Sequence, residues 1–205
     1  MLRPFIDAHV HLNTNTQAKL QLAAQYDAYF VSINTDIPFF IDLQAQQEMI
    51  TTLNKSAQRS FFITSFDTQY WNTPRWLPHA MSQIKAGIAA GAKGVKIWKN
   101  IGMDENLKDA QGNFVLLDDA RFDPIFQYLS DAGILLINHQ GEPRNCWLPL
   151  EEMTVTSDRN YFAAHPEYHM FKNKHYPSYE THMAARERVL ERYPKLNYVG
   201  LHLFS

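Results

Sequence analysis

Two patterns of apolar residues alternate along the chain. Short runs of apolar and β-branched residues are typical of strands, and apolar residues that recur every three to four positions are typical of amphipathic helices. Strands are expected at residues 5–12, 28–34, 60–66, 94–98, 134–139 and 197–202, and helices at residues 17–26, 43–57, 77–90, 123–132 and 178–193. This alternation predicts right-handed βαβ units and a parallel sheet.

One long segment does not follow the alternation. Residues 142–177 carry neither a clear strand nor a clear helix pattern, so a long loop insertion is expected there. Elsewhere the boundaries are marked by helix-stopping residues such as Gly91 and Gly133, and no hydrophilic linker separates one part from another. We therefore expect a single domain over residues 1–205.

Composition narrows the class of protein. The chain has 205 residues, 19 of them basic and 21 acidic, for a formal charge of -2. This balance gives no electrostatic footprint for nucleic acid or an anionic membrane, and no apolar run is long enough to cross a bilayer. Cys146 is the only cysteine, so no internal disulfide forms, and we expect it to be a packed residue rather than a nucleophile. The first residues run directly into a strand without a signal peptide, so a cytoplasmic protein is expected.

The first predicted strand carries two histidines two positions apart. Because strand side chains alternate between faces, His9 and His11 point the same way, as does Asp7, while Val10 points the other way. Two imidazoles at the C-terminal end of a buried strand are a ready pair of metal ligands. The alternative is a pair of packed or surface histidines.

Two more histidines end predicted strands. His139 ends the fifth and His202 ends the sixth. The C-terminal ends of parallel strands meet at one mouth of an α/β barrel, where ligands are bound. The four histidines together favour a metal site over chance placement.

Lys96 lies in the fourth predicted strand, between Val95 and Ile97, and should face the barrel interior. A buried lysine is costly unless it is paired or chemically altered. Lys96 therefore either forms an ion pair, with Asp7 or Glu142, or bridges metal ions. Lys99 lies just beyond the strand and faces substrate or solvent.

These motifs resemble those of the amidohydrolase superfamily, in its amidohydrolase-related (amidohydrolase 2) branch. The segments IDAHVHL, GAKGVKIWKNIGM, LLINHQGEP and LNYVGLHLFS occur in the family's order over nearly the whole chain. The resemblance implies a (β/α)8 TIM-barrel fold, of which about six of the eight βα units are present here. It also implies one or two divalent metal ions, usually zinc.

The resemblance assigns roles to the residues already singled out. His9, His11, His139 and His202 would bind metal, and a carbamylated Lys96 would bridge two ions. His202 would instead orient substrate or water in one-metal members. The implied reaction is hydrolysis of a small amide, ester or lactone by metal-activated water, and some members carry out non-oxidative decarboxylation or hydration.

The sequence departs from the family in two ways. The aspartate at the end of strand eight, a metal ligand and general base, has no counterpart, because the chain is expected to be truncated after strand six. Phe204 stands where a small residue is usual and would crowd that strand's mouth. Glu142 or Asp67 would be a poor substitute for the aspartate. A catalytically silent truncated barrel is therefore an alternative, and the open sheet makes a homo-oligomer possible.

The segment after the fifth strand supplies the remaining candidates. Glu142 and Arg144 lie nearest the expected metal, followed by Trp147 and many aromatic residues. These aromatics either form a lid that selects a small-molecule substrate or pack over the barrel rim, and packing is favoured for most. The catalytic candidates are Lys96, His202 and Glu142, and the substrate candidates are Arg144, Lys99 and Trp147. His79 is expected to be an ordinary histidine on a helix surface.

Overall fold

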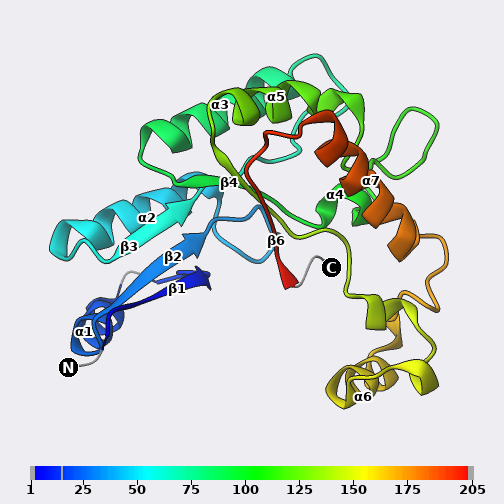
Figure 1. Cartoon of the computed structure of the whole chain (residues 1–205), viewed down its shortest axis with the longest axis horizontal. Coiled ribbons are helices and arrows are strands. Elements are labelled where there is room, and N and C mark those ends of the chain that lie inside the picture. The colour runs from blue at the N-terminus through cyan, green and yellow to red at the C-terminus, as the bar shows by residue number, and fades with distance from the viewer. Residues whose placement is uncertain (1–2, 15, 203–205) are drawn as a thin grey trace. The chain divides into compact units, whose positions relative to one another are not determined.

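The structure is a computed structural model that describes residues 3–14 and 16–202 (Figure 1). Phe204 lies outside the described residues. The chain divides into two compact units, and the division runs through two strands. Of the described residues, 3–14, 16–96 and 134–136 belong to the first unit, and 97–133 and 137–202 belong to the second.

The first unit contains a three-stranded parallel sheet of order β1-β2-β3. Its strands and the helices that follow them are β1 (Phe5–Val10), α1 (Gln17–Gln25), β2 (Ala28–Ile33), α2 (Leu43–Ser56), β3 (Ser60–Ile63) and α3 (Trp76–Ala89). Thr64, directly after β3, forms a parallel bridge to Val95. These elements match the expected ones to within a few residues.

Apolar residues on one face of this sheet pack against the helices. Leu12, Leu20, Ile50, Leu53 and Phe62 form a buried cluster, with Val10 and Phe30 against it. The side chain of Asp42 caps α2 by accepting a hydrogen bond from the backbone N–H of Ala45 at 2.8 Å. The positions at i, i+3 and i+4 on α2 therefore face the sheet as their spacing predicts.

The strand that carries the first histidine pair is more exposed than expected. β1 lies at the edge of its sheet, and Phe5 and Ile6 are 52% and 63% exposed. The prediction of a buried strand is wrong for residues 5–9, because β1 pairs only with β2 in its sheet. Leu12, just beyond the strand, is buried.

The second sheet has the order β4-β5-β6. Its elements are β4 (Gly94–Ile97), α4 (Asn100–Met103), α5 (Asp123–Asp131), β5 (Leu135–Asn138), α7 (Tyr179–Arg192) and β6 (Tyr198–Gly200). In the second unit, fully buried side chains of α5, Ile125, Phe126 and Leu129, form much of the core. The side chain of Ser178 caps α7 by accepting from the N–H of Thr181. The predicted alternation of strands and helices is confirmed.

The segment expected to be a loop insertion contains regular structure. It holds α6 (Thr156–Ala164) and three short 3₁₀ helices, at Arg144–Trp147, Leu150–Glu152 and Pro166–Tyr168. None of the residues of α6 is buried, so the helix has no apolar stripe for periodicity to reveal. The prediction that a single domain spans the chain remains a prediction.

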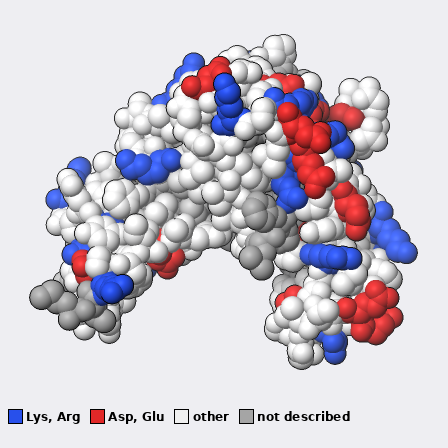
Figure 2. All heavy atoms as spheres, in the orientation of Figure 1, with Lys and Arg blue, Asp and Glu red and all other residues white. Residues whose placement is uncertain are grey.

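The surface carries charges of both signs. On the face shown in Figure 2, basic and acidic side chains lie beside one another along α7, whose sequence includes Glu180, Arg186, Glu187 and Arg188. Within the described ranges, no helix is long and apolar enough to cross a membrane.

Candidate functional site

The two histidines of the first strand lie on the same face. The ring centroids of His9 and His11 are 5.4 Å apart, and the His11 ring also contacts Phe40 at 5.3 Å. Val10, between them, packs on the opposite face against the buried cluster. The alternation that places both imidazoles on one face is therefore as the sequence predicts.

The environment of His11 favours its neutral form. Burial lowers the pKa of His11, and the nearby positive charge of Lys96 lowers it further, although a hydrogen bond from the ring to the carbonyl of Ile33 acts in the opposite direction. A hydrogen bond of one ring nitrogen to a backbone carbonyl fixes the tautomer and leaves the other nitrogen free to bind a metal. Only neutral imidazole is a metal ligand.

Lys96 is buried, with 2% of its surface exposed. Burial lowers the pKa of its ammonium group to about 7. Its backbone is held on both sides: its N–H donates to the carbonyl of Thr64, and its carbonyl accepts from the hydroxyl of Ser65. Over residues 3–14 and 16–202, Lys96 forms no ion pair with Asp7, so the desolvation of its amine is not offset by that carboxylate.

The second pair of histidines belongs to the second unit. The ring centroids of His139 and His202 are 4.4 Å apart. The N–H of His139 donates to the carbonyl of Ile97, which aligns the end of β5 with the end of β4. His202 has a φ of 51°, in the left-handed region that non-glycine residues seldom adopt and that is common at functional sites.

A carboxylate and a lysine meet beyond β4 and β5. The ammonium of Lys99 pairs with the carboxylate of Glu142, and both side chains are about a quarter exposed. The indole N–H of Trp147 donates to the backbone carbonyl of Glu142 at 3.2 Å. Arg144, at the start of a 3₁₀ helix, is exposed. The structure thus joins Glu142, Lys99 and Trp147 in one group and leaves Arg144 in solvent.

The ring separation within each histidine pair can be compared with that of two imidazoles on one metal ion. Two imidazoles on one tetrahedral zinc, at nitrogen–metal distances of about 2.1 Å, place their ring centroids about 5 Å apart. The separations of 5.4 Å and 4.4 Å bracket this value. In the part of the chain that the structure describes, no group of three or more His, Cys, Asp or Glu side chains is arranged to hold a metal ion.

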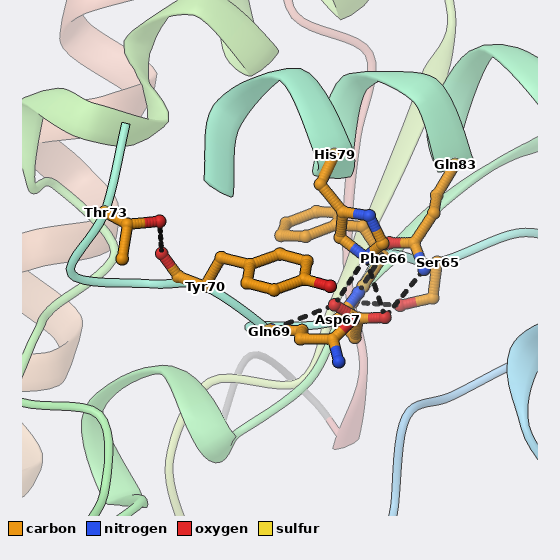
Figure 3. A network of polar contacts seen from close by, with 8 residues as sticks. All are labelled: Ser65, Phe66, Asp67, Gln69, Tyr70, Thr73, His79 and Gln83. Carbon is orange, nitrogen blue, oxygen red and sulfur yellow. Dashed lines mark hydrogen bonds and ion pairs between the residues drawn. The ribbon is translucent and has the colours of Figure 1, made fainter. Parts of the chain in front are cut away.

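Asp67 and His79 form a network that the sequence did not predict (Figure 3). The ring of His79 contacts both carboxylate oxygens of Asp67, at 3.0 and 3.2 Å, and the amide of Gln83 donates to the same carboxylate at 2.7 Å. The backbone N–H of Gln69 donates to it as well. His79 is a partly exposed histidine on helix α3, as expected, but its pairing with a carboxylate 12 residues earlier was not predicted. Since neighbours from α3 already occupy its oxygens, Asp67 is poorly suited to replace a missing catalytic carboxylate.

A second histidine, His182, is buried in a way that the sequence did not predict. It is 1% exposed, and burial lowers its pKa to about 4. Its ring lies against Gly102 and Gly141, which have φ values of 99° and 64°. Gly141 immediately precedes Glu142, so His182 packs under the loop that carries this carboxylate. The signal in the sequence was the i, i+3 spacing of His182 and Ala185 on the buried face of α7.

Cys146 is a packed residue, as predicted. It is buried, its thiol donates to the carbonyl of Tyr168 at 3.0 Å, and burial raises its pKa to about 12. The thiolate needed for nucleophilic attack is therefore not formed near neutral pH.

Comparison with known proteins places this geometry on a known fold. No protein-family model and no curated protein matches the sequence. A solved 2,6-dihydroxybenzoate decarboxylase from Rhizobium matches all of this chain and 67% of its own, with a TM-score of 0.53 and 13% identity.

Two further solved structures are similar over most of this chain. A TIM-barrel protein from Bordetella bronchiseptica has a TM-score of 0.48 and 16% identity, and an amidohydrolase from Mycobacterium avium subsp. paratuberculosis has a TM-score of 0.48 and 15% identity. The chain spans about half of each of these, 50% and 47%. The expected α/β fold is confirmed: the chain shares the fold of the Rhizobium decarboxylase over 67% of that protein's length.

Proposed function

We propose that this chain is part of a metal-dependent enzyme of the amidohydrolase type, which hydrolyses a small amide, ester or lactone. The shared fold makes the C-terminal ends of the strands the expected place for chemistry. The proposed cofactor is a divalent ion, with zinc as the first choice, and the proposed substrate is a small molecule. One or two ions are compatible with it.

The observation that carries the proposal is the arrangement around His11. Its ring lies 5.4 Å from that of His9 on one face of β1, and the charge of buried Lys96 acts on the same ring. A neutral His11 ring beside a desolvated amine is costly to bury and has no evident structural purpose. Such clusters of perturbed titratable groups are typical of functional sites.

The residues divide into ligands and positioning groups. His9 and His11 bind the metal, and His139 and His202 form a second pair of donors. Lys96, with a pKa near 7, supplies a neutral amine that carbon dioxide can convert to a carbamate ligand. When bound, a divalent ion would lower the pKa of water and polarise a carbonyl.

Glu142 is the carboxylate that transfers the proton. Its pairing with Lys99 fixes its direction, and the indole of Trp147 holds its backbone. General acid–base groups of this kind contribute about 10²–10⁴-fold to a rate. Arg144 is exposed and free to contact the polar end of a substrate, together with Lys99 and Trp147.

Non-oxidative decarboxylation is the second candidate. The likeness to the 2,6-dihydroxybenzoate decarboxylase extends over the whole chain and is the one match above a TM-score of 0.5 among those described. The same ligands would serve, and the reaction would release carbon dioxide instead of consuming water.

The test is turnover by the zinc-loaded full chain on a panel of small amides, esters, lactones and carboxylic acids. Product analysis separates hydrolysis from release of carbon dioxide. We expect turnover in one class, reduced by about 100-fold or more in His11→Ala. His175→Ala is the matched control, because that ring is exposed and its carboxylate partner is Glu105, which has no proposed role in the site. Absence of turnover across the panel, with zinc bound, would favour a catalytically silent barrel.

A further inference from the structure

A pocket in the second unit lies beside Glu142. Its volume is about 330 Å³, and its walls include two carboxylates, one lysine and three aromatic rings. These are the side chains of Lys99, Glu142, Asp158, Tyr161, Phe162 and Tyr168. The aromatic residues come from α6 and the 3₁₀ helix after it, within the segment expected from the sequence to form a lid or to pack over the barrel rim.

The charges that line the pocket sum to a negative value. Lys99 is neutralised by its ion pair with Glu142. Asp158 accepts hydrogen bonds from neutral donors, the amide of Asn145 at 2.9 Å and the hydroxyl of Ser157 at 3.4 Å. Throughout residues 3–14 and 16–202, no basic side chain forms an ion pair with Asp158. One carboxylate charge therefore remains for a ligand.

The aromatic walls are exposed and ordered against one another. Tyr161 and Tyr168 are 49% and 55% exposed, and their rings are nearly parallel, with centroids 6.3 Å apart. The ring of Phe162 meets that of Tyr161 edge to face at 5.4 Å. Aromatic rings present a negative face, which attracts cations.

We propose that this pocket binds an organic ammonium group, from a primary amine to a quaternary ammonium, carried by the small-molecule substrate. An anion would meet Asp158 and find the pocket's lysine already paired. A bare metal ion would find aromatic walls in place of oxygen ligands. An alkylammonium matches both features, because its charge faces the carboxylate and its methylene or methyl groups face the rings.

This inference rests on the proposed function in one respect: it identifies the ammonium ligand as part of the substrate. The pocket would then be the part of the site that selects the substrate. The binding chemistry itself depends only on residues of the second unit. Two experiments therefore separate the claims: zinc content tests the proposed function, and ammonium binding tests the pocket.

The experiment is calorimetric titration of the full chain with choline and with its uncharged isostere 3,3-dimethyl-1-butanol. We expect choline to bind at least about 10-fold more tightly, as cation–π and carboxylate contacts imply. Asp158→Asn and Tyr161→Leu should each weaken choline binding by about 10-fold and leave binding of the alcohol nearly unchanged. Neither side chain is buried, so both variants are expected to fold, and circular dichroism verifies this.

Asp131→Asn is the matched control. Asp131 is an exposed residue at the end of α5 and accepts a hydrogen bond from Gln127 in the same helix. The control removes the same charge and should bind choline as the parent protein does. Equal affinity for choline and the alcohol would overturn the proposal. So would tighter binding of benzoate that Lys99→Met abolishes, because that result would identify an anion site.

Discussion

The residues that most shape this protein's chemistry are ionisable groups for which burial is the cause of a lowered pKa. Lys96 and His182 are 2% and 1% exposed, and burial lowers the pKa of each. The Nε2 atom of His182 has no hydrogen-bond partner in the described part of the chain. Each such group costs stability, because water is lost without full compensation.

His182 should make stability depend on pH. Its pKa is lowered to about 4 in the folded protein, so between pH 4 and 6.5 the unfolded chain binds more protons than the folded one. Stability is therefore complete above about pH 6.5 and falls as the pH is lowered towards 4, by up to about 3 kcal/mol. Urea denaturation at a series of pH values measures the loss.

The variant His182→Gln should flatten this part of the curve. The control is His175→Gln, which removes an exposed histidine paired with Glu105 and leaves the contribution of His182 in place. If the parent and His182→Gln lose the same stability between pH 6.5 and 4, the buried histidine is not the cause.

Lys96 should be retained at a cost in stability. Replacing it with methionine nearly keeps the length of the side chain and removes the desolvated amine. In metal-free protein, the free energy of unfolding of Lys96→Met should therefore be about 1–3 kcal/mol higher than that of the parent. The same variant should bind less zinc. A loss of stability in Lys96→Met would show that the amine forms favourable contacts that outweigh its burial.

Sequence reasoning at this scale succeeded where alternation within one strand decided the answer. The common face of His9 and His11 follows from a period of two. It failed for His79 and His182, whose partners are Asp67 and the backbone of two distant loops. These contacts depend on how loops return to a helix, which local pattern does not encode.

At the scale of elements, strong periodicity and capping residues predicted the strands and helices. Asp42 and Ser178 cap helices in the structure where the sequence places polar residues before apolar runs. The missed helix α6 has no buried residue and begins after Val155, whose side chain does not cap it. Its position depends on contacts with the neighbouring 3₁₀ helices.

Helix α7 lies so close to α4 that a residue larger than glycine at position 102 should destabilise the fold. A Cβ added at Gly102 would lie 2.4 Å from Cε1 of His182. Gly91 has the same φ, 99°, but a Cβ there would meet nothing within 4 Å. Gly91→Ala should therefore cost about 1 kcal/mol of backbone strain, and Gly102→Ala at least about 3 kcal/mol.

Chemical denaturation of both variants measures the difference. The double variant Gly102→Ala, His182→Ala should recover part of the loss, because it removes the ring that the new methyl group meets. Equal losses of stability in Gly91→Ala and Gly102→Ala would mean that packing against His182 does not restrict position 102.

For the whole molecule, the chain order of the elements predicted the α/β fold, and the structural similarity to the Rhizobium decarboxylase confirms that fold. The site was predictable only in part. Histidines at strand ends can be found in the sequence because the ends of strands can be predicted from local pattern. The pairing of Glu142 with Lys99 cannot be found in this way, because it joins residues 43 positions apart. The aromatic pocket beside them depends on α6, which the sequence did not reveal.

The account depends most on metal binding by the strand-end histidines, and zinc content measures this directly. The full chain is stripped with chelator, reloaded with zinc and desalted, and its zinc content is measured by plasma mass spectrometry. Three double variants are treated in the same way: His9→Ala/His11→Ala, His139→Ala/His202→Ala and the control His165→Ala/His175→Ala. The control pair is exposed, and both of its rings lie beside glutamates. We predict one or two zinc ions per chain in the parent and in the control, and less than half of that in each of the other two variants. Zinc content that is unchanged by loss of both strand-end pairs, or absent from the folded parent, would contradict the account.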